Sequence, residues 1–282
     1  MQPKAAVIND FASFGRCSLA VALPILSAIR VQCCAVPTAI FTNHTGFPSF
    51  SWTDYTAHMD DYIREWKRIG LDFAAIQTGF LGSPAQIDFV FRFLDAFRTG
   101  KTIVAIDPVM GDYGRLYSTY NDELAQGMRR LLAVADILTP NLTEASVLAG
   151  REYDPEIGDD ELLELARALS EPNGAKVAIT GVQRGSRMLN FVYERGRPPA
   201  IHAEEKIGED RSGTGDVFSS VVLGEAVHGA PFAASVARAS AFVASAVRRS
   251  VELGLPNNYG LAIEEVLGEL TRPSGDSPFF GR

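Results

Sequence analysis

The sequence predicts an α/β protein, a three-layer α/β/α sandwich in which helices cover both faces of a mostly parallel central sheet. Segments with strand character alternate with segments of helical periodicity along most of the chain, an order typical of parallel sheets. The predicted strand at 102–106 is a continuous apolar run, which indicates a strand covered on both faces. Neither an internal repeat nor a linker divides the chain, so we expect a single domain over residues 1–270.

The individual elements follow from apolar periodicity and from turn residues. Ser83 is a suitable N-cap with Pro84 at the first helical position. Pro24 lies inside the first predicted helix, and Pro37 indicates that the second predicted strand is irregular or at an edge. The predicted strands are 4–8, 33–41, 73–78, 102–106, 136–139, 176–180, and a hairpin of 186–193 with 197–203. The predicted helices are 18–28, 54–69, 84–97, 121–133, 141–148, 159–169, 216–227, 231–250 and 262–270, followed by a loose tail at 271–282.

Composition and charge narrow the classes of function. The chain has 282 residues, of which 46% are hydrophobic and 21% charged, an ordinary balance for a globular protein. Its 26 basic and 34 acidic residues give a net charge of −8, which offers no electrostatic footprint for nucleic acid. No apolar run is long enough to span a bilayer, and the N-terminus does not resemble a signal peptide. We therefore expect a cytoplasmic protein that acts on small molecules.

The spacing of the cysteines and the absence of two nucleotide-binding motifs exclude further classes of protein. Cys17, Cys33 and Cys34 can form neither a disulfide framework nor a zinc site at ligand spacing. The chain has no G-x-G-x-x-G after its first strand and no G-x-x-x-x-G-K-[ST]. A dinucleotide-binding fold and a P-loop fold are both disfavoured.

The strongest chemical signal is the stretch 210–219, which precedes a long apolar helix. Gly213, Thr214 and Gly215 allow a ligand to approach the backbone closely, and the first turn of a helix offers unpaired N–H groups for phosphate oxygens. Asp216 lies within that turn. It either complements the helix dipole or acts as a general base beside a phosphate site.

Polar residues follow five predicted strands, where the carboxyl ends of a parallel sheet would bring them together. One pair, Asp107 and Glu144, suits Mg²⁺ held through water and phosphate oxygens. The alternatives are a strand-end turn for Asp107 and an ordinary first-turn helix residue for Glu144. His44 is either a substrate contact beside Thr45 or a solvated loop residue. The clusters are Asp10; Asn43, His44 and Thr45; Asp107 and Asp112; Asn141 and Glu144; Thr180 and Gly181.

In combination these motifs resemble the pyridoxal kinases, the vitamin B6 salvage enzymes of the ribokinase-like superfamily. The resemblance covers about residues 5–250 and includes, in chain order, the segments 8–15, 17–24, 42–45, 79–83, 107–112, 139–144 and 213–216. It implies ATP-dependent phosphorylation of the 5′-hydroxymethyl group of pyridoxal, pyridoxine or pyridoxamine. It also implies Mg²⁺ and a homodimer, and leaves a monovalent-cation requirement open.

The resemblance also implies roles for single residues. Asp216 would be the base, with Gly213, Thr214 and Gly215 as the anion hole. The other implied roles are nucleotide binding for Asn141, Thr180 and Gly181, metal binding for Asp107 and Glu144, and contact with the pyridine ring for Asp10, His44, Thr45 and Phe80. Asp10 stands where many members carry serine, and Phe80 where they carry tyrosine. Substrate choice is therefore open between a B6 vitamer and hydroxymethylpyrimidine, and a non-catalytic vitamer-binding protein is a further alternative.

The segment 112–120 is polar, aromatic and interrupted by glycine, and it contains nothing that looks core-forming. Because phosphoryl transfer requires that water be kept away, we expect it to be a mobile lid that closes over bound phosphates. Asp112 begins this lid, and Arg115 is its cationic candidate for the phosphates. A locally packed surface loop is the alternative.

Overall fold

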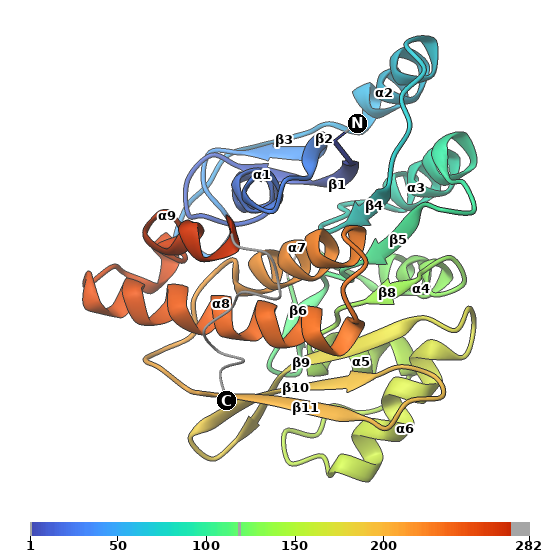
Figure 1. Cartoon of the computed structure of the whole chain (residues 1–282). Coiled ribbons are helices and arrows are strands. Elements are labelled where there is room, and N and C mark those ends of the chain that lie inside the picture. Colours follow the sequence, from blue (N-terminus) through green and yellow to red (C-terminus); the bar gives the residue numbers. More distant parts are fainter. Residues whose placement is uncertain (1, 118–119, 272–282) are drawn as a thin grey trace.

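A nine-stranded sheet runs through the part of the chain that the computed structural model describes, residues 2–117 and 120–271 (Figure 1). Its order is β11-β10-β9-β8-β5-β4-β1-β2-β3. The strands from β9 through β2 are parallel, and the others are antiparallel to their neighbours. The mostly parallel sheet is thus confirmed. The strands are β1 (Lys4–Ala12), β2 (Gln32–Phe41), β3 (Trp52–Asp54), β4 (Ala75–Thr78), β5 (Ile103–Ile106), β8 (Ile137–Leu138), β9 (Lys176–Arg184), β10 (Arg187–Tyr193) and β11 (Ala200–Glu205).

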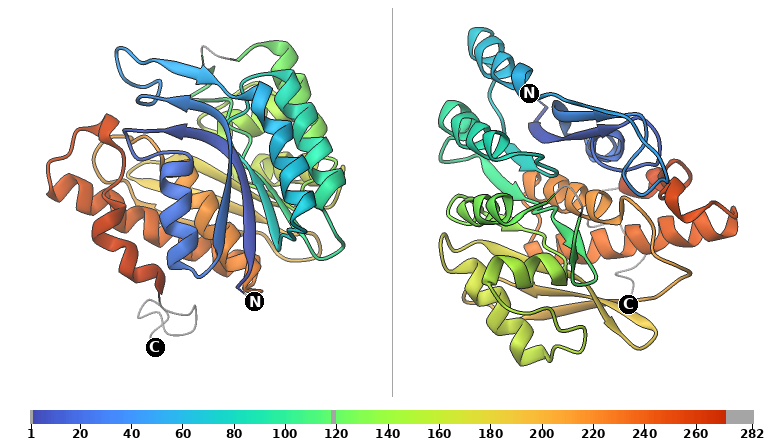
Figure 2. Two further views of the ribbon diagram at one scale, coloured as in Figure 1. Left: turned by 90° about the horizontal axis from the view of Figure 1, so that it is seen from above. Right: turned by 180° about the vertical axis from the view of Figure 1, so that it is seen from behind.

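Helices cover both faces of this sheet, which confirms the three-layer arrangement (Figure 2). One layer holds α2 (Thr56–Arg68), α3 (Pro84–Phe97), α4 (Asp122–Leu131), α5 (Leu142–Ala149) and α6 (Asp159–Ser170). The other holds α1 (Leu19–Ala28), α7 (Thr214–Val227), α8 (Phe232–Glu252) and α9 (Ile263–Val266).

The strands contribute to two separate hydrophobic cores because successive side chains point to opposite faces. In β1, Ala6 and Ile8 pack with the layer that contains α3, while Ala5 and Val7 pack with the layer that contains α7. All four side chains are fully buried. This double burial explains why the strands read as continuous apolar runs.

Several helix boundaries match the capping residues. Asn121 and Asn141 accept hydrogen bonds from the backbone of Leu124 and Glu144 and so cap α4 and α5. Pro84 opens α3 as expected, but the hydroxyl of Ser83 makes no capping bond. Pro24 lies inside α1.

The structure corrects three boundaries and the expected edge position of one strand. β1 continues to Ala12, so Asp10 lies within the strand, at a bulge where the register shifts. Pro37 sits opposite that bulge, and the short strand β3, which the apolar pattern did not predict, makes β2 an inner strand. β9 likewise runs past Thr180 to Arg184. The last predicted helix divides into α9 and a 3₁₀ turn, Leu267–Thr271.

The expected lid begins as a small hairpin of β6 (Gly111–Asp112) and β7 (Arg115–Leu116). Tyr113 and Gly114 form its turn with positive φ angles of 50° and 74°, as a two-residue hairpin turn requires. Tyr120 is buried in the core, so the prediction that nothing in 112–120 is core-forming was wrong for this residue. Residues 118 and 119 lie outside the described part.

The single-domain boundary at residue 270 stays a prediction, and of the expected tail only Thr271 lies within the described residues. In the same part of the chain, every helix is too short or too polar to cross a membrane.

Candidate active site

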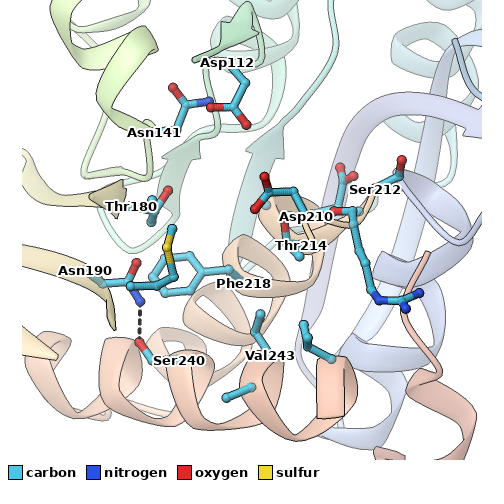
Figure 3. A pocket seen from close by; sticks show the side chains of 18 of the residues that line it. Asp112, Asn141, Thr180, Asn190, Asp210, Ser212, Thr214, Phe218, Ser240 and Val243 are labelled. Carbon is cyan, nitrogen blue, oxygen red and sulfur yellow. Dashed lines mark hydrogen bonds between the residues drawn. The ribbon is translucent and has the colours of Figure 1, made fainter. Parts of the chain in front are cut away.

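A cavity of about 520 Å³ opens at the carboxyl ends of β5, β8 and β9, between the N-terminus of α7 and the β10–β11 hairpin (Figure 3). One end is apolar, and there Asn190 donates to the hydroxyl of Ser240 at 2.7 Å. The other end is acidic. Its acidic lining includes Asp107, Asp112, Glu144, Asp210 and Asp216, and the apolar lining includes Met188, Phe218, Val243, Ala244 and Val247.

The first turn of α7 lines the acidic end. Gly213 has a φ of 83°, and a Cβ there would lie 2.2 Å from the carbonyl oxygen of Arg16, so only glycine fits. A Cβ on Gly215 would meet no atom within 4 Å beyond its chain neighbours and the backbone of its own helix. The open space beside Gly215 and the positive helix end together make this turn suitable for an anion.

Asp216 is half-buried in the same turn. Its Oδ1 accepts a hydrogen bond from Asn9 Nδ2 at 3.0 Å, and the backbone of Ser18 donates a second bond. Burial raises the pKa of the Asp216 carboxyl, while these hydrogen bonds and nearby His44 oppose the rise. The side chain thus lies where the cavity meets the end of β1.

Asp107 and Glu144 are both buried and both line the cavity. Burial is the main cause that raises the pKa of each carboxyl. Repulsion from Asp216 adds to the rise for Asp107, and repulsion from Asp107 adds to the rise for Glu144. Hydroxyls of Ser219 and Thr139 bond Asp107. The two oxygens of Glu144 accept from the backbone of Met110 at 3.0 Å and of Asn141 at 2.8 Å. Glu144 therefore serves as a capping residue of α5, the alternative that its position in the sequence left open.

The three predicted nucleotide residues all line the cavity. The Asn141 side chain is already occupied, since it caps α5 and donates to the carbonyl oxygen of Gly111 at 2.7 Å. The backbone of Thr180 forms an isolated parallel β-bridge with that of Asn141, and Gly181 has a φ of 72°.

The predicted ring contacts lie outside the lining of this cavity. Asp10 is buried, and burial raises the pKa of its carboxyl to about 7, with Ser18 opposing that rise. Phe80 packs edge-on against Phe41, with 6.0 Å between the two ring centroids. These two residues are joined to Asp216 through Asn9, which accepts from the backbone N–H of both Asp10 and Phe80.

His44 uses both ring nitrogens within the protein. Nδ1 accepts from the backbone of Gly46, so Nε2 carries the hydrogen and donates to the carbonyl oxygen of Asn258 at 2.8 Å. A substrate can therefore meet only the ring face or edge of His44. Thr45 is exposed on the same loop. Arg115 is exposed outside the cavity lining, and the cations that line it are Lys206 and Arg211.

A segment after α8, residues 255–260, joins three parts of the site. Arg211 donates to the carbonyl oxygens of Leu255 and Pro256, and Arg16 donates to that of Tyr259 at 3.1 Å. His44 donates to the carbonyl oxygen of Asn258 in the same segment. The segment therefore binds the glycine loop through Arg211, the loop after β1 through Arg16 and the loop after β2 through His44.

Sequence reasoning missed several of these residues. Asn9 is not among the residues predicted from the sequence, although an amide next to the predicted site residue Asp10 is a usable signal. Ser18 contributes through its backbone, which has a φ of 56°. A serine in the sequence does not indicate such a conformation. The apolar end of the cavity comes from elements distant in sequence and carries no motif.

A model of the family described as phosphomethylpyrimidine kinase matches residues 23–260. The chain belongs to this family. A structure of a putative phosphomethylpyrimidine kinase from Bacteroides thetaiotaomicron, crystallised with pyridoxal, is 36% identical, with 97% of each chain covered and a TM-score of 0.93. Pyridoxal kinase from Lactobacillus plantarum is 27% identical, covers 95% of this chain and 96% of its own, and has a TM-score of 0.88. These neighbours confirm the ribokinase-like fold.

Curated relatives include a pyridoxal kinase from Arabidopsis thaliana, 30% identical over 65% of this chain and 61% of its own length. A pyridoxine/pyridoxal/pyridoxamine kinase from Bordetella pertussis is 26% identical over 86% of this chain and 87% of its own. The resemblance to vitamin B6 kinases that the motifs indicated is confirmed, and the chain is a kinase.

Proposed function

We propose that this family member is an ATP-dependent kinase that phosphorylates the 5′-hydroxymethyl group of a B6 vitamer. Relatives named for pyridoxal, pyridoxine and pyridoxamine support the substrate class, as does the similar structure that holds pyridoxal. The family and these relatives are kinases, which supports ATP as the phosphoryl donor.

The observation that carries the proposal is the position of Asp216. It lines the large cavity on one side and is bonded through Asn9 to the backbone of Asp10 and Phe80 on the other. An acceptor alcohol near Asp10 and Phe80 and a nucleotide in the cavity would therefore meet at this carboxylate. Asp216 takes the proton of the hydroxyl, and the first turn of α7 stabilises the charge on the transferring phosphoryl group.

The two ends of the cavity suit the two ends of ATP. The apolar end, with Met188 and Val243, suits the base, while Asn141, Thr180 and Gly181 line the wall between base and phosphates. Lys206 and Arg211 supply positive charge. The hairpin at Asp112 lines the acidic end and forms the start of the proposed lid.

The acidic end also fits Mg²⁺. Within the described residues, no lysine or arginine bonds Asp107 or Glu144, and two desolvated carboxylates without a cation favour binding one. Asp107 would be the nearer ligand and Glu144 would act through water, since backbone N–H groups hold both of its oxygens. Mg²⁺ would neutralise phosphate charge. No group of three His, Cys, Asp or Glu in the described part could hold a metal by itself, which agrees with a metal that arrives with the nucleotide.

A monovalent-cation requirement, a homodimer and a cytoplasmic location are proposed from the family resemblance alone.

Hydroxymethylpyrimidine is the second candidate substrate, because a Haemophilus influenzae relative, 28% identical over 64% of this chain, is named a hydroxymethylpyrimidine/phosphomethylpyrimidine kinase, and the family description names the phosphomethylpyrimidine activity. A non-catalytic vitamer-binding protein is disfavoured, since binding alone needs no carboxylate beside the anion site.

One assay separates these possibilities. Phosphorylation rates for pyridoxal, pyridoxine, pyridoxamine and hydroxymethylpyrimidine are measured under identical conditions with ATP, with Asp216→Asn as the blank. We expect the highest kcat/KM with a B6 vitamer. A higher value for the pyrimidine would assign the protein to thiamine synthesis, and no turnover with any of the four would reject both proposed classes of substrate.

A further inference from the structure

Asn9 is buried at the bulge near the end of β1, and its side chain makes three hydrogen bonds. Nδ2 donates to Asp216 Oδ1 at 3.0 Å. Oδ1 accepts from the backbone N–H of Phe80 at 2.7 Å and from that of Asp10 at 2.9 Å. Gly79 leaves room for this amide, since a Cβ there would lie 2.4 Å from Asn9 Cγ.

These partners fix the orientation of the amide. Both backbone N–H groups need an acceptor, so the oxygen of Asn9 must face them and the NH₂ group must face Asp216. An amide NH₂ cannot accept a proton. The carboxylate of Asp216 is therefore held as an acceptor in one place, by Asn9 at Oδ1 and by the backbone of Ser18.

We infer that Asn9 is a positioning residue for the catalytic base, which it holds in register with the β1 and β4 strand ends that border the acceptor. The inference rests on the proposed role of Asp216. Loss of Asn9 should reduce kcat much more than it changes KM, because the base would move while the nucleotide cavity, which Asn9 does not line, stays intact.

A purely structural role is the alternative, and Gln86 provides a matched control. Its buried amide also makes three hydrogen bonds, from Gly82 N and to Thr38 O and Thr56 Oγ1, but none to the site. Gln86→Leu and Asn9→Leu remove comparable bonds. We expect both to lower Tm, and only Asn9→Leu to lower kcat, by about 10- to 100-fold, with KM for ATP within about threefold.

A double-mutant cycle tests whether Asn9 acts through Asp216. In an Asp216→Asn background, Asn9→Leu should lower kcat by less than about twofold, because the group that it positions is already gone. An equal loss in both backgrounds, or a Gln86→Leu variant that loses as much kcat, would overturn the inference. If Asn9→Leu does not fold, Asn9→Asp keeps the acceptor for both N–H groups and sets a carboxylate against Asp216, so kcat should still fall.

The hydrogen bond is also measurable without substrate, so that failure of the proposed function leaves this test intact. In the ¹⁵N–¹H spectrum of the unliganded protein, the side-chain amide proton of Asn9 should shift upfield in Asp216→Asn, where a charged acceptor is replaced by a neutral one. An unchanged resonance would show that the contact is absent in solution, whatever substrate the enzyme uses.

Discussion

The side-chain amide of Asn141 donates to the carbonyl oxygen of Gly111 at 2.7 Å while its oxygen caps α5. One residue therefore ties a helix N-terminus to the hairpin that begins the proposed lid. We expect Asn141→Asp to keep the cap but to free the hairpin, because a carboxylate cannot donate to a carbonyl.

Hydrogen exchange over residues 111–117 tests this effect. Exchange should be faster in Asn141→Asp, and a non-hydrolysable ATP analogue plus vitamer should slow it in the parent. Asn121→Asp is the control, since Asn121 caps α4 in the same way without contact to the hairpin. Exchange unaffected by either ligand or variant would leave 111–117 a static connection.

Asp216→Asn should lower kcat by roughly 10²–10⁴-fold, the usual cost of removing a positioned base. ATP and vitamer affinities should stay nearly unchanged, because the amide has the same shape. Steady-state kinetics and calorimetric titration give the two quantities. Near-parental turnover would refute the assignment of the base.

Gly215→Ala and Gly213→Ala should behave oppositely in stability. Alanine at 215 meets no atom beyond its chain neighbours and its own helix and suits a helix, so Tm should hold or rise, with a gain of at most about 1 kcal/mol. Turnover should still fall, because the new methyl group would enter the proposed anion site. Alanine at 213 would press on the Arg16 carbonyl at a φ of 83° and should lower Tm. A fully active Gly215→Ala variant would show that the anion hole does not lie at this turn.

Asp107→Asn should raise the Mg²⁺ concentration needed for half-maximal rate without weakening vitamer binding. The double amide with Glu144→Gln should do so further, but it also sets an amide nitrogen against one of the two backbone N–H donors and should cost about 1–3 kcal/mol of stability. The single variant is therefore the cleaner probe. Metal titrations of Asp107→Asn and the parent that overlay would exclude the metal role.

Asp10 should make the unliganded protein less stable as pH rises. Its folded-state pKa of about 7 lies above the ordinary 3.8, so the folded protein binds the proton more tightly than the unfolded chain does. The contribution is fully present below pH 3.8 and is lost as pH rises to about 7, at no more than about 1.4 kcal/mol per pH unit. Asp10→Asn should flatten this part of the stability profile in denaturant titrations from pH 5 to 8. Parallel profiles would show that the carboxyl is not buried in solution.

Sequence patterns predicted the layers and the parallel sheet because double burial leaves continuous apolar strands, as in β1 and β5. They also located the α7 turn, since its glycines and Asp216 are adjacent in sequence. They could not show that Glu144 accepts from the backbone N–H of Met110, that His44 is turned toward Asn258, or that Asn9 faces Asp216. Those contacts join residues separated by 34, 214 and 207 positions, which only tertiary packing brings together. The bulge that keeps Asp10 inside β1 likewise arises from pairing with β2.

The segment 255–260 follows β11 and α8, in a connection of the kind that ordinarily tolerates insertion and deletion. Here its carbonyl oxygens accept from Arg211, His44 and Arg16. A chain cut after residue 254 would keep every strand of the sheet yet lose the part that ties the glycine loop to Arg16 and His44. Length in this stretch should therefore vary little among functional homologues, and a single inserted residue should be tolerated far worse here than in the hairpin loop at 194–199.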